Sequence, residues 1–162
     1  MEEKERKVRA APCGLYCGAC TIYITYNSGD KEALKSMAER INQERDTKLD
    51  PETDFPCEGC LSSTVAWYCR ECGMRDCAVS KGITHCAQCP DFPCKIITDF
   101  NDDEWPHHGE VLTNVKRQKE IGIAAWLDEQ EQRWFCPECG KVTGWYDTSC
   151  RQCGTQLPER FK

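Results

Sequence analysis

The sequence predicts a small α+β protein in which cysteine clusters replace much of the usual hydrophobic core. Fifteen of the 162 residues are cysteine, close to the level of about 8–10% that is typical of chains whose fold depends on their sulfurs. Apolar residues recur at helical spacing in only two long stretches. Because an odd number of cysteines cannot all pair as disulfides, bound metal is the first interpretation of them.

The cysteines divide the chain into three expected parts. Eleven lie within residues 13–94, none within 95–135, and four within 136–153. We therefore expect a metal-stapled, cysteine-rich module over residues 11–100, a helical connector over 101–132 and a zinc ribbon over 133–162. The segment 57–100 is too dense in cysteine, glycine and proline for long regular elements.

A packing helix is predicted over residues 27–46. Ser28 or Asp30 can cap its start, and one apolar stripe opposes a charged face. The preceding segment Thr21–Tyr26 is β-branched and aromatic, which is typical of a short strand or of the first turns of a helix. Asp50–Pro56 is expected to be a loop. The stripe consists of Leu34, Met37, Ala38 and Ile41.

A longer helical stretch is predicted from about His107 to Gln132. Gly122 interrupts it, so either one helix bends there or two shorter helices meet. We expect the ribbon to pack back on this connector through Trp134, Phe135 and Trp126. The apolar positions of the stretch are Val111, Leu112, Val115, Ile123, Trp126 and Leu127.

The C-terminal cysteines give the most specific pattern, two CxxC pairs that are each followed by glycine. Two intervening residues let both sulfurs face one ion, and glycine permits the tight turn that aims backbone amides at them. The pattern predicts a zinc ribbon with a structural zinc. Trp145 and Tyr146, at its tip, can stack on a base or a partner, or cover a small core. The ligands would be Cys136, Cys139, Cys150 and Cys153.

Two further groups follow less regular spacings. In the second group, two CxxC pairs are separated by eight residues, which favours another four-cysteine zinc site. The third group can close its own tetrahedral site or interleave with the second in a cross-braced pair. The second group consists of Cys57, Cys60, Cys69 and Cys72, and the third of Cys77, Cys86, Cys89 and Cys94.

The first group, Cys13, Cys17 and Cys20, has only three sulfurs. If the other groups are closed tetrads, this group is left open. It can then hold a zinc with a water or histidine, or an iron–sulfur cluster with one exposed iron. The candidate fourth ligands are His85, His107 and His108, and the tyrosines that can line the site are Tyr16, Tyr23 and Tyr26.

Charge and hydropathy exclude several classes of protein. The formal net charge is −6, and three four-thiolate zinc sites would take it to about −12, which argues against non-specific binding to nucleic acid. No apolar run reaches the roughly 18–20 residues of a membrane span, and the N-terminus lacks the apolar stretch of a secretory signal. We therefore expect a cytoplasmic protein with reduced thiols and no membrane partner. Asp102, Asp103 and Glu104 are interpreted as a solvated helix start.

The motifs CGLYCGACTIY, CEGC and CRECGMRDCAVSKGITHCAQCPDFPC resemble the cysteine-rich family known as domain of unknown function 3795. The resemblance runs from about Ala11 to Phe100, and the tail is similar to an extension that some members carry. It implies a small cytoplasmic prokaryotic protein with a metal-binding role and no established activity. The cysteines that match the family pattern are Cys13, Cys17, Cys20, Cys57, Cys60, Cys77, Cys86, Cys89 and Cys94.

Three functions compete on these grounds. The favoured hypothesis is a zinc-binding scaffold or adaptor with two to four zinc ions and a protein partner, and the lack of a recognisable catalytic motif favours a non-enzymatic role without deciding it. The second is a redox or metal-dependent enzyme whose open site is Cys13, Cys17 and Cys20, with zinc or an iron–sulfur cluster. The third is contact with nucleic acid or the transcription machinery through the ribbon.

Overall fold

The computed structural model describes residues 6–161, which are about half helical. In this part of the chain the β-structure is limited to isolated antiparallel bridges, at Ala10–Tyr16, Phe135–Val142 and Ser149–Gln156. The strand content expected of an α+β protein is therefore small. The first five residues, on which the expectation of no secretory signal partly rests, lie outside the described residues.

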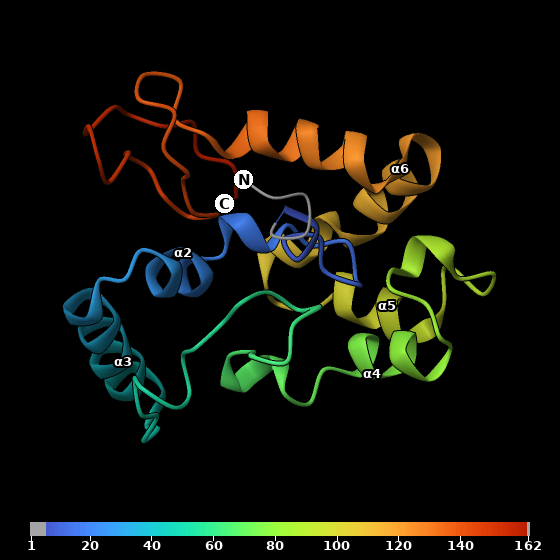
Figure 1. The fold of residues 1–162 in the computed structure, drawn as a ribbon, viewed down its shortest axis with the longest axis horizontal. Coiled ribbons are helices and arrows are strands. Elements are labelled where there is room, and N and C mark those ends of the chain that lie inside the picture. The colour runs from blue at the N-terminus through green and yellow to red at the C-terminus, as the bar shows by residue number, and fades with distance from the viewer. Residues whose placement is uncertain (1–5, 162) are drawn as a thin grey trace.

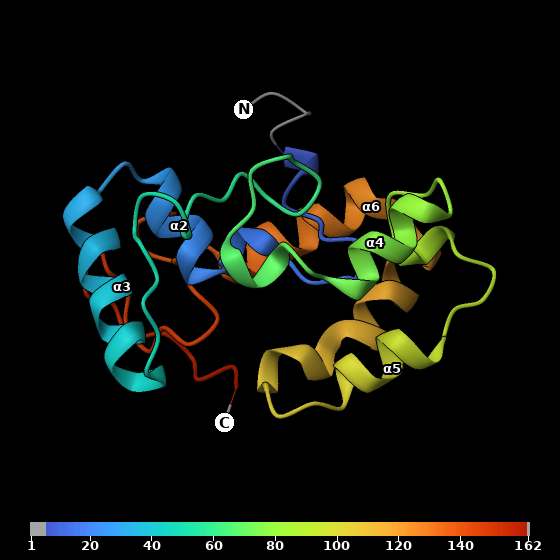
Figure 2. The same ribbon diagram turned by 90° about the horizontal axis from the view of Figure 1, so that it is seen from below.

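The helical elements are short except for two. In chain order they are the 3-10 turn η1 (Cys17–Ala19), α2 (Thr21–Asn27), α3 (Lys31–Arg45), η2 (Trp67–Cys69), α4 (Gly73–Ser80), η3 (Cys86–Gln88), α5 (Lys95–Asn101), η4 (Pro106–Glu110) and α6 (Val111–Trp134). Helices α2 and α3 lie at one end of the molecule, and α4 and α5 lie at the other (Figures 1 and 2). The N-terminal cysteine segment lies between these ends (Figure 2).

Helix α2 contains Thr21–Tyr26, the segment whose sequence is compatible with either a strand or a helix. The helix begins where the Ile24 amide donates to the Cys20 carbonyl, 2.9 Å away, and it buries Ile22, Tyr23 and Thr25. The β-branched residues are tolerated because tertiary packing of this face outweighs their weak helix propensity.

Helix α3 confirms the predicted packing helix. The Asp30 carboxylate caps it by accepting from the Ala33 amide at 2.9 Å, and Asp46 ends it in a left-handed conformation. Met37 and Ala38 are buried against the core. The Asp30 cap satisfies a backbone donor that the first turn of a helix otherwise leaves free.

Helix α6 is two helical segments that meet at Gly122, whose φ of 82° and ψ of 160° are not helical. Figure 2 shows the resulting change of direction. The second segment buries Trp126 and Trp134 in one core cluster with Tyr16, whereas Phe135 is only partly buried. The first residues of the ribbon therefore share a core with the connector. No helix within residues 6–161 has the length and apolar character of a membrane span.

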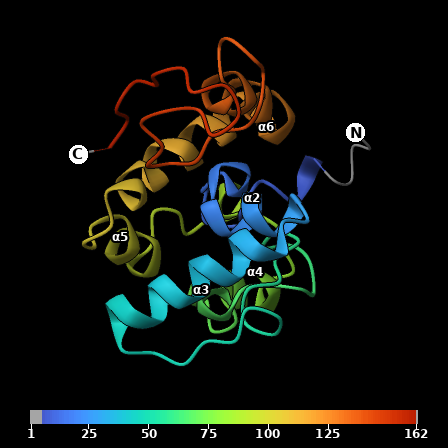
Figure 3. The ribbon, with the colours of Figure 1, turned by 90° about the vertical axis from the view of Figure 1, so that its left-hand side faces the viewer.

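The C-terminal segment folds over α2 (Figures 1 and 3). The Trp145 amide donates to the Ala19 carbonyl at 3.0 Å, and the Trp145 ring stacks on His107 with centroids 4.0 Å apart. Trp145 therefore covers the core rather than standing free, while Tyr146 stays 47% exposed.

Gly59 provides a test of the packing between the chain start and the second cysteine group. Its φ is +98°, and a Cβ there would overlap the carbonyl oxygen of Val8. We expect Gly59→Ala to lower the free energy of unfolding by about 1–2 kcal/mol through backbone strain, and by a further 1–3 kcal/mol or so through overpacking. Gly82→Ala, also at positive φ but with no neighbour within 4 Å, should show the strain alone in urea denaturation. If both variants lost the same free energy of unfolding, the close approach of Gly59 to Val8 would be contradicted.

Candidate metal centre

The C-terminal cysteines lie in two similar turns. In the first, the Gly140 amide donates to the Cys136 carbonyl, and in the second the Gly154 amide donates to the Cys150 carbonyl, both at 2.9 Å. Both glycines have positive φ, 67° and 75°, a conformation that other residues adopt only with strain. The sequence spacing CxxCG therefore fixes each turn locally.

The four sulfurs of these turns form a tetrad with the dimensions of a single-ion site. All four ligand atoms lie within 4.8 Å of one another. The Cys136–Cys153 and Cys139–Cys150 sulfur pairs are both 3.6 Å apart. A tetrahedral zinc with Zn–S bonds of about 2.3 Å places its sulfurs roughly 3.8 Å apart. Within residues 6–161 this is the one group of three or more potential ligands that meets the 4.8 Å limit.

Hydrogen bonds stabilise the thiolate form of two of these sulfurs. The Thr155 hydroxyl, 3.3 Å from the Cys153 sulfur, and the Thr155 amide lower the pKa of Cys153 to about 6. The amides of Cys153 and Gln152 lower the pKa of Cys150. Donors that stabilise the thiolate favour metal binding, because zinc binds the deprotonated sulfur.

The first cysteine group is not isolated in the structure. The Cys17 sulfur lies 3.8 Å from the Cys60 sulfur, although 43 residues separate them, and the Cys20 sulfur lies 3.3 Å from the Tyr68 hydroxyl. Hydrogen bonds from Cys17 and then Cys69 lower the pKa of Cys60 to about 4. The expected separation into an open trio and an independent second tetrad is therefore not what the structure shows.

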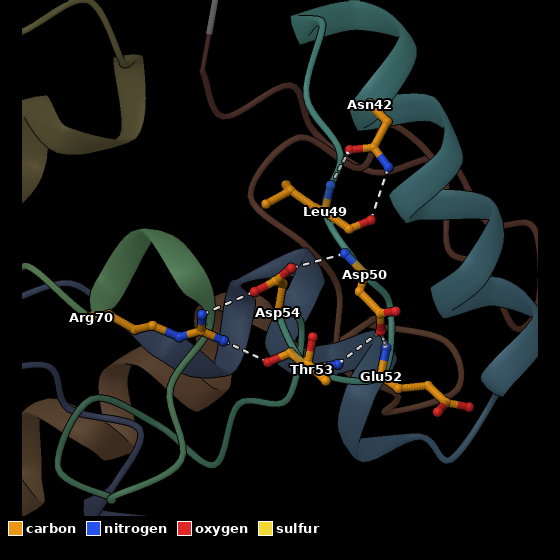
Figure 4. Close-up of polar contacts among 7 residues, drawn as sticks. All are labelled: Asn42, Leu49, Asp50, Glu52, Thr53, Asp54 and Arg70. Atoms are coloured by element: carbon orange, nitrogen blue, oxygen red, sulfur yellow. Dashed lines mark hydrogen bonds and ion pairs between the residues drawn. The ribbon is translucent and has the colours of Figure 1, made fainter.

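The segments that carry the second group are held together by the loop before Cys57. Figure 4 shows the Asn42 side chain bonded to both backbone polar groups of Leu49, at 2.9 and 2.8 Å. It also shows Arg70 donating to the Asp54 carboxylate at 2.9 Å and to the Thr53 carbonyl at 2.5 Å. The predicted loop is thus anchored to α3 on one side and to η2 on the other.

Contacts between the same loop and η2 also bring the segments of Cys57 and Cys69 together. The Trp67 amide donates to the Asp54 carbonyl at 2.8 Å, and the Trp67 ring packs on buried Phe55 with centroids 4.8 Å apart. Cys57 follows Phe55 by two residues, and Cys69 follows Trp67 by two. The charge of Cys57 raises the pKa of Cys69, after the larger effects of Cys60 and burial.

The third group lies at the other end of the molecule, beside α5 and α6. Burial, and after it the sulfurs of Cys94, Cys89 and Cys77, raise the pKa of Cys86 to about 11. Lys81 places its ammonium 3.5 Å from the Cys89 sulfur. These effects place Cys86 near other cysteines, but no three sulfurs of this group lie within 4.8 Å of one another in residues 6–161.

His85 does not complete any cysteine site. Its ring is buried, with Nδ1 2.9 Å from the Thr84 hydroxyl and Nε2 3.2 Å from the Ala10 carbonyl. Both ring nitrogens are therefore engaged by protein oxygens.

The other two histidines are also held by oxygen partners. His107 Nδ1 lies 2.7 Å from the Tyr146 hydroxyl, and His108 Nδ1 lies 2.7 Å from the Asp103 carboxylate. The interpretation of Asp103 as simply solvated is thus incomplete, since its carboxylate holds His108. Within residues 6–161 no hydrogen bond joins a histidine to a sulfur of the first cysteine group, although His85 reaches the Ala10 carbonyl three residues before Cys13.

A different tyrosine from those singled out by the sequence reaches the sulfurs. Tyr16 is buried edge-on against Trp126, with ring centroids 6.2 Å apart, and Tyr68 contacts Cys20 instead. The one sequence feature that indicates a place for Tyr68 near the sulfurs is its position directly before Cys69. Its contact with Cys20 cannot be predicted, because the two residues are far apart in the sequence.

A cleft of about 1060 Å³ opens between α2, residues 58–63 and the start of the ribbon. Its lining includes Arg9, Tyr23 and Glu58 but neither cysteine nor histidine. The cleft and the sulfur clusters are therefore separate features.

A family model described as "Protein of unknown function (DUF3795)" matches residues 9–99, over half of the chain. The match contains the first three cysteine groups and ends before α6, so it does not extend to the ribbon. Neither the curated proteins nor the solved structures gave a match.

The ribbon tetrad can be tested with Cys139→Ala. Removing this ligand should release one zinc per chain, and the free energy of unfolding should fall by several kcal/mol because structural zinc supplies folding energy. Zinc content by elemental analysis and urea denaturation measure both effects. Gln152→Ser, at an exposed position of the second turn, is the matched control and should retain the zinc. Full zinc content in Cys139→Ala would show that the tetrad is not a metal site.

The environment of His107 gives a pH prediction. Burial and then the charge of His108 lower the pKa of His107 to about 3, below the value of about 6.5 in an unfolded chain. The unfolded state therefore takes up the proton first, and the stability that this neutral ring contributes is lost as pH falls from about 6.5 towards 3. NMR of the ring nitrogens should show His107 neutral at pH 5. Titration near 6.5 in the folded protein would contradict the buried environment.

Proposed function

We propose, from the premise that this chain belongs to the family described as Protein of unknown function (DUF3795), that it is a zinc-dependent scaffold or adaptor for a protein partner. The observation that carries the proposal is the ribbon tetrad, whose four sulfurs lie within 4.8 Å of one another. Such a closed four-thiolate arrangement is typical of structural zinc, because catalytic zinc keeps a coordination position for water.

The division of the core explains why such a protein depends on metal. The buried apolar residues fall into four separate clusters, and cysteines occupy positions within or beside several of them. Each structural zinc supplies an apparent ~10–16 kcal/mol to folding, which is comparable with the whole stability of an ordinary domain. Metal can thus join clusters that are individually too small.

The charge of the chain favours a protein partner over nucleic acid. The formal charge of −6 becomes more negative with each four-thiolate zinc site, and phosphate binding requires the opposite sign. One face of the Trp145 ring is also covered by His107, so that face is not available to stack on a base.

The enzyme alternative depends on an open site at Cys13, Cys17 and Cys20. The contact of Cys17 with Cys60 weighs against it, because it brings a fourth sulfur to the trio. Iron and sulfide in the purified protein would revive this alternative.

Metal removal tests the proposed function. Protein purified without oxygen should be colourless and contain three or four zinc ions per chain, as measured by elemental analysis. After chelation under reducing conditions, we expect the helical circular-dichroism signal to fall sharply and zinc to restore it, with magnesium as the control ion. A chelated chain that keeps its full fold would rule out the scaffold role of zinc.

A further inference from the structure

The cleft beside α2 is lined by apolar side chains that the core does not use. They come from four segments, namely the chain start, α2, the loop 58–63 and the first residues of the ribbon. None of them belongs to the four core clusters or packs against one, and Leu61 and Val142 are each 37% exposed. Such a lining favours a ligand with an apolar body. The five residues are Val8, Ile24, Leu61, Phe135 and Val142.

A positive charge lies in the wall of this cleft with little to balance it. Arg9 is the one basic residue among the lining residues, and its side chain is only 20% exposed. The Glu131 carboxylate is 3.8 Å from the Arg9 guanidinium, beyond hydrogen-bond distance, and Arg6 binds that carboxylate at 2.9 and 3.0 Å. The neighbouring phenols of Tyr16 and Tyr23 are neutral at pH 7 and do not balance the charge.

The Arg9 guanidinium also has hydrogen-bonding capacity that the protein leaves unused. Its Nε is buried and has no hydrogen-bond partner. A buried donor without a partner costs stability, and natural structures contain few of them. An anion that enters the cleft therefore meets a guanidinium for which no carboxylate of the described chain competes at hydrogen-bond distance.

The backbone holds Arg9 in place before any ligand binds. The Cys17 amide donates to the Arg9 carbonyl at 2.7 Å. The preceding carbonyl, of Val8, lies so close to Gly59 that a Cβ there would overlap it. A site that is fixed in this way loses less conformational entropy when it binds a ligand.

The other polar side chains of the lining are less suited to hold a buried anion. The Asn27 amide donates to two backbone carbonyls, at 2.7 and 2.9 Å, and the Ser62 hydroxyl donates to a third at 2.7 Å. These groups hold the walls together. Glu58 is exposed, so water and salt screen its negative charge. The largely buried charge of the cleft is therefore that of Arg9.

We propose that this cleft binds the C terminus of a partner protein. The terminal carboxylate pairs with Arg9, since a guanidinium can bind both oxygens of a carboxylate through parallel hydrogen bonds. The apolar last residues of the partner lie against Val8, Ile24 and Phe135. The volume of about 1060 Å³ is at the upper end of what small-molecule sites need, which favours several peptide residues over one small acid. The choice of a protein as the ligand rests on the proposed adaptor function.

Two-dimensional ¹H–¹⁵N NMR of the zinc-loaded full chain tests the cleft. The probes are the peptide acetyl-Ala-Ala-Val-Leu with a free carboxylate, the same peptide with an amidated C terminus, and octanoate. The free peptide should shift the Arg9 Nε resonance and the amides of Val8 and Val142. The amidated peptide should bind about tenfold more weakly or worse, because it lacks the charge-assisted hydrogen bonds.

Three results of this titration would overturn the proposal. The first is equal affinity of the two peptides, and the second is a set of shifts that lie outside the cleft. The third is octanoate that binds more tightly than the free peptide, which would assign the cleft to a free acid. A chain with its full zinc content that binds no peptide would also overturn it while leaving the zinc-dependent scaffold intact.

Variants give an independent readout of the same affinity. Arg9→Gln should weaken binding of the free peptide about tenfold or more and leave the amidated peptide little changed. Leu61→Glu should also weaken the free peptide, by repulsion in the cleft. Val79→Glu adds the same charge at a 72% exposed position of α4 outside the cleft, and should bind like the native chain.

Native affinity in Leu61→Glu, or an equal loss in Val79→Glu, would overturn the proposed site. If Arg9→Gln does not fold, this pair of variants and the comparison of the two peptides on the native chain decide the question.

Discussion

Thiolates that are buried together repel one another and lose their hydration, so a cluster of buried thiolates is stable only if a cation lies among them. Burial raises the pKa of Cys13, Cys20 and Cys57, so without metal these side chains are neutral thiols in a small core. A divalent ion favours the deprotonated thiolates over the neutral thiols, because its charge compensates the negative charge that is costly to bury. The helices at the two ends of the molecule (Figure 1) are connected through this sulfur-rich centre.

The ribbon and the N-terminal part are mechanically linked as well. Trp145 bonds to the backbone of Ala19, directly before Cys20, and Trp134 shares a core cluster with Ala10 and Tyr16. These contacts join the C-terminal segment to residues 10–19, and the three-part division stays a prediction.

The local features could be predicted from the sequence. Helix α3 follows from its apolar stripe and the Asp30 cap, the bend of α6 from Gly122, and the ribbon tetrad from two CxxCG turns. Each depends on residues within about one turn or hairpin of one another, where spacing determines geometry. The sequence does not decide whether Thr21–Tyr26 forms a strand or a helix, because its β-branched residues favour a strand whereas its packing favours the helix α2.

The grouping of the remaining sulfurs could not be predicted in the same way. Spacing suggests a trio and a tetrad, but the contact between Cys17 and Cys60 joins cysteines that are 43 residues apart. The contact of Tyr68 with Cys20 cannot be predicted either, because it also joins residues that are far apart in the sequence. Cysteines that are close in sequence bind the same ion only if no cysteine from another segment lies closer to them.

X-ray absorption at the zinc edge tests most directly whether zinc held by sulfur alone organises this fold. For the full native chain we predict an average shell of four sulfurs at about 2.3 Å with no nitrogen or oxygen ligand. A shell that contains histidine nitrogen or water oxygen, or a protein that carries iron in place of zinc, would contradict the account.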